Sequence, residues 1–107
     1  MKTLKNKGLR LTEEEIKAIK ETSKEVFGKD VKVWIFGSRT DLSKKGGDID
    51  IYIEIPDFDA DKIFDKKIKF LVDLEDKIGE QKIDVIVAPY GCKKYYCLEA
   101  KNTGIML

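Results

Sequence analysis

The sequence predicts an α+β protein in which helices and a small β-sheet form two layers. Segments with apolar residues three and four positions apart, typical of amphipathic helices, are interspersed with short apolar or alternating runs, typical of strands. The chain has 107 residues, 42% of them hydrophobic, which is enough for one core and too few for two. We therefore expect a single domain spanning residues 1–107.

The first predicted element is a helix in the segment LTEEEIKAIKETSKEVFG, residues 11–28. Thr12 is placed to cap its N-terminus, and Glu15 stands where it completes a capping box. Gly28 is expected to end the helix. A stripe of apolar residues supplies its buried face: Ile16, Ile19, Val26 and Phe27.

Two strands are expected next, joined by a polar loop. Residues 31–36, VKVWIF, are mostly apolar and stop at Gly37, whereas residues 40–47 are polar and end in a glycine pair. Residues 48–55, DIDIYIEI, alternate strictly, so their two sets of side chains face opposite sides of a strand. One side carries four isoleucines, and the other carries Asp48, Asp50, Tyr52 and Glu54. We expect Tyr52 and Glu54 to be surface residues.

The second half of the chain predicts a helix over about residues 59–78, a strand over residues 83–88 and a short final helix within residues 92–104. The longer helix is expected to cover the sheet with one face: Phe64, Ile68, Leu71, Leu74 and Ile78. An apolar tail follows at residues 105–107. We expect Tyr95, Tyr96 and Leu98 to pack on the sheet, although an interface, including one in a homodimer, would use the same residues.

The composition limits the function classes. The net charge is +1, so no overall positive field attracts nucleic acid or an acidic membrane surface. No signal peptide or membrane-spanning run is present, and we expect a cytoplasmic protein. The chain contains no histidine, which excludes a Cys/His zinc site, and we interpret Cys92 and Cys97 as reduced packing residues.

Three aspartates carry the strongest chemical signal. Asp48 and Asp50 are two residues apart on a strand, so they share a face with Cα atoms about 6.5–7 Å apart. Asp84 lies between apolar residues of another predicted strand, where a carboxylate is costly unless it is paired or bound to metal. If the two strands are neighbours, the three acids converge. Carboxylates without histidine or thiolate suit Mg²⁺, which takes substrate phosphates as further ligands.

Gly37 and Ser38 follow the first strand and are suited to binding phosphate. A glycine lets the backbone approach closely, and a serine offers a hydroxyl and an amide N–H. Alone, this pair would be only a turn, and an isolated Asp-x-Asp pair would be surface acids. EF-hand, P-loop and Rossmann patterns are absent, and without histidine Ser38 lacks the usual base for nucleophilic catalysis.

Together, IFGSR (residues 35–39), GDIDIYIE (47–54) and KIDVIV (82–87) resemble the nucleotidyltransferase superfamily of DNA polymerase beta, and in length its minimal nucleotidyltransferase (MNT) branch. The resemblance covers nearly the whole chain. It implies a mixed sheet with helices packed on one face and the three acids on the open side.

The resemblance also implies roles for single residues. Asp48 and Asp50 would bind two Mg²⁺ ions, and Asp84 would bind one ion and help activate the acceptor hydroxyl. Gly37 and Ser38 would hold the triphosphate of ATP, with Arg39 as a further contact. The chain departs from the family pattern because Thr40, Asp41 and Leu42 stand where a further arginine and glycine are common, which puts the strength of triphosphate binding in doubt.

Minimal members are typically encoded beside a HEPN protein. The resemblance therefore implies an antitoxin that transfers AMP from ATP to a tyrosine of a HEPN-type toxin. We expect another protein to supply the acceptor surface, because 107 residues leave no room for a separate domain that grips the acceptor. The near-neutral charge agrees with a protein acceptor rather than nucleic acid. The alternative is a binding module that neutralises its partner by occlusion, without catalysis.

Overall fold

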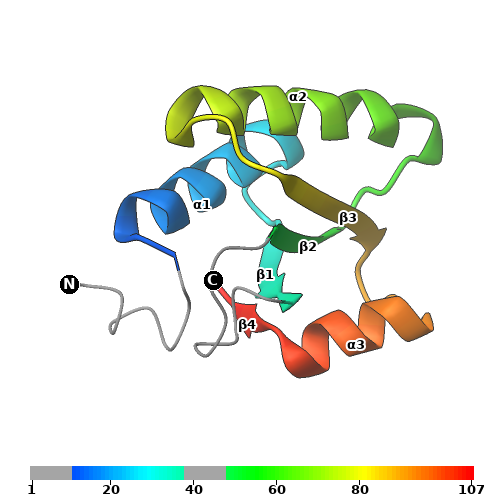
Figure 1. Ribbon diagram of the computed structural model, residues 1–107. Helices are drawn as coiled ribbons and strands as arrows, with labels where there is room; N and C mark the ends of the chain where they lie inside the picture. The colour runs from blue at the N-terminus through cyan, green and yellow to red at the C-terminus, as the bar shows by residue number, and fades with distance from the viewer. Residues whose placement is uncertain (1–10, 38–47) are drawn as a thin grey trace.

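The computed structural model of the protein describes residues 11–37 and 48–107 (Figure 1). In chain order the elements are α1 (Glu13–Phe27), β1 (Lys32–Phe36), β2 (Ile49–Ile55), α2 (Ala60–Ile78), β3 (Ile83–Pro89), α3 (Tyr95–Thr103) and β4 (Ile105–Met106). The strands form one sheet in the order β3-β2-β1-β4. The predicted α+β class and the mixed sheet are confirmed, since β2 pairs parallel with β3 whereas β1 is antiparallel to both β2 and β4.

The first helix begins and ends as predicted. The Thr12 hydroxyl accepts a hydrogen bond from the Glu15 N–H, and the Glu15 carboxylate accepts one from the Thr12 N–H, each at 3.0 Å. This capping box satisfies two N–H groups that have no partner within the helix. At the other end, Gly28 has φ 104°, a conformation that favours glycine, and its N–H bonds to the Lys24 carbonyl.

The alternation in β2 separates two faces of the sheet. We call the face with Ile49, Ile51 and Ile53 the inner face, since α1 and α2 cover it in the main core. These three side chains are fully buried. The outer face carries Asp50, Tyr52 and Glu54.

The outer face is partly covered, which corrects the expectation that all helices pack on one side. Tyr52 belongs to a second apolar cluster with Ala88, Cys97 and Ala100, of which the last two lie on α3. Figure 1 shows α3 on the side of the sheet opposite α1 and α2. Tyr52 is 0% exposed and Glu54 4% exposed, so the expectation that they are surface residues is wrong.

Helix α2 buries part of the predicted face: Leu74 is buried, and Leu71 and Ile78 pack partly buried against the core. Phe70 and Leu74 are fully buried, and the Phe70 ring packs against that of Phe27 at 5.8 Å between centroids. Phe64 and Ile68, which were expected to cover the sheet, are 68% and 45% exposed. The cause is that α2 must face both α1 and the sheet, so the side with Phe70 turns inward.

The C-terminal segment also differs from expectation. Tyr95, Tyr96 and Leu98 are exposed rather than packed on the sheet. The apolar tail forms β4, which extends the sheet beside β1. No helix in the described ranges is both long and apolar enough to cross a membrane.

Candidate active site

The sheet register brings two of the predicted acids together. In the parallel pairing of β2 with β3, Asp50 lies directly across from Asp84. Residues paired in this way project to the same face of a sheet. The predicted meeting of acids from two strands distant in sequence is therefore present at the end of the outer face where β2 and β3 begin.

The Asp50 side chain lies in an unfavourable electrostatic environment. Partial burial raises the pKa of Asp50 above its ordinary value, and the negative charges of Asp84 and Asp48 raise it further. A side-chain hydrogen bond with Asp84 acts in the same direction.

Asp48 joins this group from the position just before β2. It is partly exposed and forms a long ion pair with Lys82, whose Nζ lies 3.9 Å from the Asp48 Oδ2. The sequence analysis did not single out Lys82. A signal was present, because Lys82 and Asp84 are two residues apart and strand alternation places both on one face.

Gly37 packs directly against the Asp50 side chain. It follows β1, has φ 78°, and is next to Phe36, which pairs with Asp50 across the sheet. A Cβ atom at Gly37 would overlap the Asp50 carboxylate. Both the positive φ and the lack of space require glycine here.

The remaining predicted phosphate contacts, Ser38 and Arg39, lie outside the described residues. Among the predicted site residues that are described, the structure brings Gly37 and Asp84 against or opposite Asp50, and Asp48 lies near enough for its charge to raise the pKa of Asp50.

The donor chemistry of the acids fits a hard divalent cation. Three carboxylates offer only oxygen ligands, and a cation would relieve the repulsion that raises the pKa of Asp50. However, within residues 11–37 and 48–107, no three His, Cys, Asp or Glu side chains are grouped closely enough to hold a metal ion. The residues therefore match Mg²⁺ in ligand type and charge, while the described side chains do not form a completed metal site.

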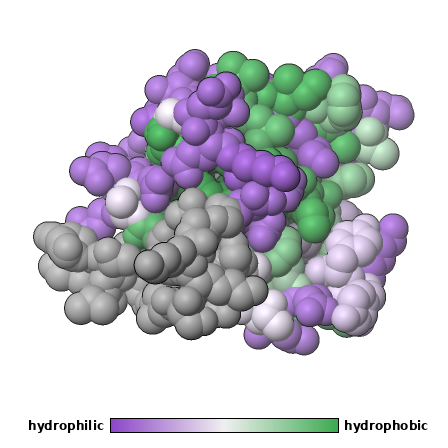
Figure 2. Space-filling model, viewed as in Figure 1, coloured by the Kyte–Doolittle hydropathy of each residue, from purple (hydrophilic) through white to green (hydrophobic). Residues whose placement is uncertain are grey.

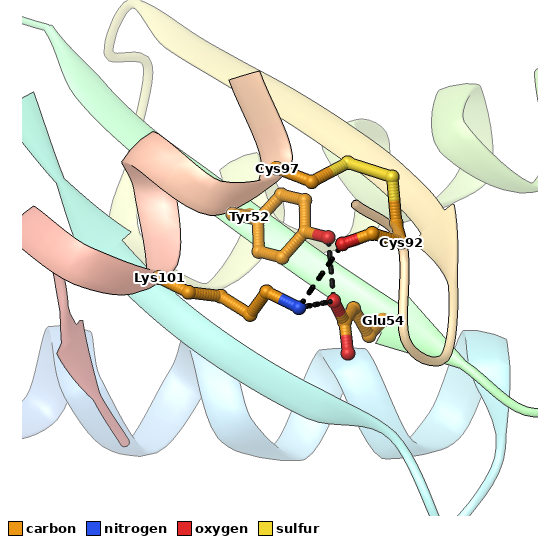
Figure 3. Close-up of a disulfide and its surroundings, with 5 residues drawn as sticks. All are labelled: Tyr52, Glu54, Cys92, Cys97 and Lys101. Atoms are coloured by element: carbon orange, nitrogen blue, oxygen red, sulfur yellow. Dashed lines mark hydrogen bonds and ion pairs between the residues drawn. A yellow bond between two sulfur atoms is a disulfide. The ribbon is translucent and has the colours of Figure 1, made fainter. Parts of the chain in front are cut away.

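The other end of the outer face holds a closed polar cluster, shown in Figure 3. The Tyr52 hydroxyl donates a hydrogen bond to the Glu54 carboxylate at 2.7 Å, and the Lys101 Nζ lies 2.7 Å from the same oxygen. Burial alone would raise the pKa of Glu54, but Lys101 and Tyr52 outweigh it and hold this pKa below its ordinary value. Burial and the Glu54 contact raise the pKa of Tyr52.

A disulfide between Cys92 and Cys97 borders this cluster (Figure 3). The interpretation of these cysteines as reduced packing residues is therefore wrong, although Cys97 is fully buried. The first turn of α3 folds back over the loop after β3 and brings the two Cα atoms within 5.9 Å. Lys101 also donates a hydrogen bond to the Cys92 carbonyl at 3.2 Å, which ties the loop to α3.

The fold and the acids at one end of its outer face together indicate a class of protein. The mixed sheet has two helices on one face, and on the other it carries acids from two parallel strands beside a glycine turn, a donor set suited to the divalent metal ions that assist phosphoryl transfer. The model of the nucleotidyltransferase domain family matches residues 16–105, which include all the predicted acids, and the chain belongs to this family. No curated protein matches the chain. Nucleotidyltransferase domains generally use a nucleoside triphosphate and a divalent metal, so the family supports a transferase that moves nucleotidyl groups.

Proposed function

We propose that this protein is a magnesium-dependent nucleotidyltransferase that transfers AMP from ATP to a hydroxyl group of a partner protein. The observation that carries the proposal is the pairing of Asp50 with Asp84 across parallel strands, in a chain with a nucleotidyltransferase domain. In a protein that uses these acids only structurally, two facing carboxylates would be a cost without a benefit.

The three acids would bind two Mg²⁺ ions, Asp48 and Asp50 both of them and Asp84 one. What supports this assignment is their oxygen-only chemistry and their mutual repulsion. When bound, the metal would neutralise charge on the triphosphate and on the leaving pyrophosphate.

The chain's own residues would position the reactants and move one proton. The acceptor oxygen attacks the α-phosphorus of ATP, the bond to the bridging oxygen of pyrophosphate breaks, and the hydroxyl proton passes to a carboxylate. Asp84 suits this last role better than Asp50, since Asp84 is exposed whereas Asp50 is partly buried. Gly37 leaves the space in which Asp50 is held, and Ser38 and Arg39 would bind the triphosphate.

The proposed acceptor is a HEPN-type toxin, which the modification would neutralise. This part rests on the resemblance to minimal nucleotidyltransferases and on the net charge of +1, which gives nucleic acid no general attraction.

A second candidate is an antitoxin that neutralises the same partner by occlusion alone. The observation that favours it is that the described residues contain no group of three side chains able to hold a metal ion. The two functions differ in their requirement for ATP, Mg²⁺ and the acids.

One experiment separates them. The protein is mixed with ATP labelled at the α-phosphate, Mg²⁺ and the product of the adjacent gene, and label on the partner is followed with and without EDTA. We expect transfer that EDTA, Asp50→Asn and Asp84→Asn each abolish. Asp57→Asn is a matched control, because Asp57 is an exposed acid in the turn after β2. Transfer that survives both site variants would refute the proposal, whereas binding and neutralisation without any transfer would establish occlusion.

A further inference from the structure

An exposed apolar stripe runs along α2, on the side of the molecule away from the candidate active site. Phe64, Ile68 and Val72 are 68%, 45% and 53% exposed. They are four residues apart and so form one continuous ridge on the helix surface. Figure 2 shows hydrophobic surface along the top of the molecule, over the position of α2 in Figure 1. Single exposed apolar side chains need no explanation, but an aligned row of three does.

Acidic residues border this stripe. At 100° per residue, Asp61, Asp65, Glu75 and Asp76 all lie within about 80° of its centre, whereas the five lysines of α2 lie about 100° or more away. All four acids are exposed, and within the described parts of the chain none of them forms an ion pair. The lysine nearest the stripe on that flank, Lys69, is instead paired with Asp73 at 3.1 Å.

We propose that the α2 stripe is a docking surface for an amphipathic helix of a partner protein, with basic residues flanking the partner's apolar face. An i, i+4 ridge fits the groove of a second helix, in the commonest packing class with axes crossing at about −50°. The acidic border would attract lysine or arginine on the partner and steer the two helices together.

A second copy of this chain suits the surface less well. Two copies related by a two-fold axis would place the same patch against itself, and the acidic borders would then repel each other. Three partly exposed side chains are also a small area beside the roughly 800 Å² per partner of a standard interface. A helix that adds its own apolar face and opposite charge is the better occupant.

This surface is independent of nucleotidyl transfer, because α2 covers the inner face while Asp50 and Asp84 lie on the outer face. A partner docked on α2 would leave the acids accessible.

The test uses the full chain, without ATP or Mg²⁺, and two labelled synthetic helical peptides of about 20 residues. Both carry a leucine ridge at i, i+4 spacing, flanked by lysines in one peptide and by glutamates in the other. By fluorescence anisotropy we expect the lysine peptide to bind at least about tenfold more tightly. Phe64→Asp with Ile68→Glu should weaken this binding at least about tenfold, and Asp61→Lys with Asp65→Lys should reverse the preference between peptides.

Controls keep the result interpretable. Lys66→Glu changes charge on the opposite side of α2 and should leave binding unchanged, and Asp84→Asn should do the same even if nucleotidyl transfer is lost or never found. Because Phe64 and Ile68 are exposed, their variants should keep the thermal unfolding midpoint of the parent chain. Binding unaffected by the stripe variants, or a preference that persists after charge reversal, would overturn the proposal. Self-association in sedimentation equilibrium that Phe64→Asp abolishes would overturn it in favour of a second copy.

Discussion

Two acids on one strand have opposite environments. Asp50 and Glu54 both project from β2 onto the outer face, four residues apart. Glu54 is 4% exposed and contacts a lysine and a tyrosine hydroxyl, and its pKa is lowered. Asp50 is less buried than Glu54, but partial burial together with the negative charges of Asp84 and Asp48 raises its pKa. Among the described residues, Asp50 forms no ion pair.

The contrast separates a structural acid from a candidate functional one. The protein supplies its own cation to Glu54 through Lys101, which closes that end of the face under α3. At Asp50 the chain supplies more negative charge and a glycine that leaves room for the carboxylate. An acid to which the described residues supply no cation is a candidate ligand for a bound metal ion.

The largest expected effect comes from neutralising the facing acids. Asp50→Asn and Asp84→Asn should each lower nucleotidyl transfer by at least about a thousandfold, because the charge that would hold the metal is removed. Neither should lower the free energy of unfolding, since each removes repulsion between carboxylates. Initial rates with labelled ATP and urea unfolding in EDTA measure the two quantities. Transfer that persists, or a marked loss of stability, would show that these acids serve the fold instead.

At the end of the outer face that α3 covers, Lys101→Met should instead lower stability. It leaves Glu54 buried without its cation, which should cost about 3–5 kcal/mol of unfolding free energy. The double variant with Glu54→Gln should recover much of this, because the buried charge is then removed. Urea unfolding measures each step. Lys69→Met is a matched control, because the Lys69–Asp73 pair is at the surface and should contribute less than about 1 kcal/mol. Equal losses of unfolding free energy for the two lysine variants would show that the buried pair contributes no more than the surface pair.

Much of the site was predictable because it depends on local periodicity. Alternation in residues 48–55 assigned Asp50 to the face opposite the isoleucines, and the apolar run around Asp84 indicated a neighbouring strand. The capping box and the glycine that ends α1 were also predictable, because each depends on residues only a few positions apart in the sequence. The parallel register that puts Asp50 opposite Asp84 then follows from pairing two short strands whose inner faces are both apolar.

What failed depends on contacts between distant segments. The alternating pattern of β2 does not predict that α3 covers Tyr52, because this cover depends on contacts of α3 with distant residues, including the Lys101–Glu54 ion pair. Similarly, α2 has apolar residues on two sides, and only the packing of Phe70 on Phe27 decides which side is buried. The sequence pattern correctly included Leu74 in the buried face but also included Phe64 and Ile68, which lie on the side that we propose for docking.

The disulfide offers a further test of the closed end. Cys92→Ser with Cys97→Ser should lower the unfolding free energy by about 2 kcal/mol, a modest value because the bridge spans a separation of only 5 residues. Treating the parent chain with dithiothreitol should give the same shift, and the double serine variant should not respond. Nucleotidyl transfer should be unchanged, since the bridge lies at the end of the outer face away from Asp50 and Asp84. Mass spectrometry after alkylation of the unreduced chain provides the direct check, and two alkylated cysteines would contradict the bridge.

The smallest effect is a difference in pH dependence between the two acids, measured by urea unfolding in EDTA. The pKa of Glu54 is lowered by folding, so its stabilisation is present above its unfolded value of about 4.5 and is lost as the pH falls through the folded value. Glu54→Gln should therefore be less stable than the parent at neutral pH, and the gap should close in acid. The pKa of Asp50 is raised by folding, so its penalty is fully present above the folded value and disappears below the unfolded value of about 3.8. Asp50→Asn should therefore be more stable than the parent at neutral pH, with a gap that also closes in acid but has the opposite sign. If both gaps had the same sign, the two ends of the strand would not differ electrostatically, and Asp50 would lose its distinction as a candidate ligand for a bound cation.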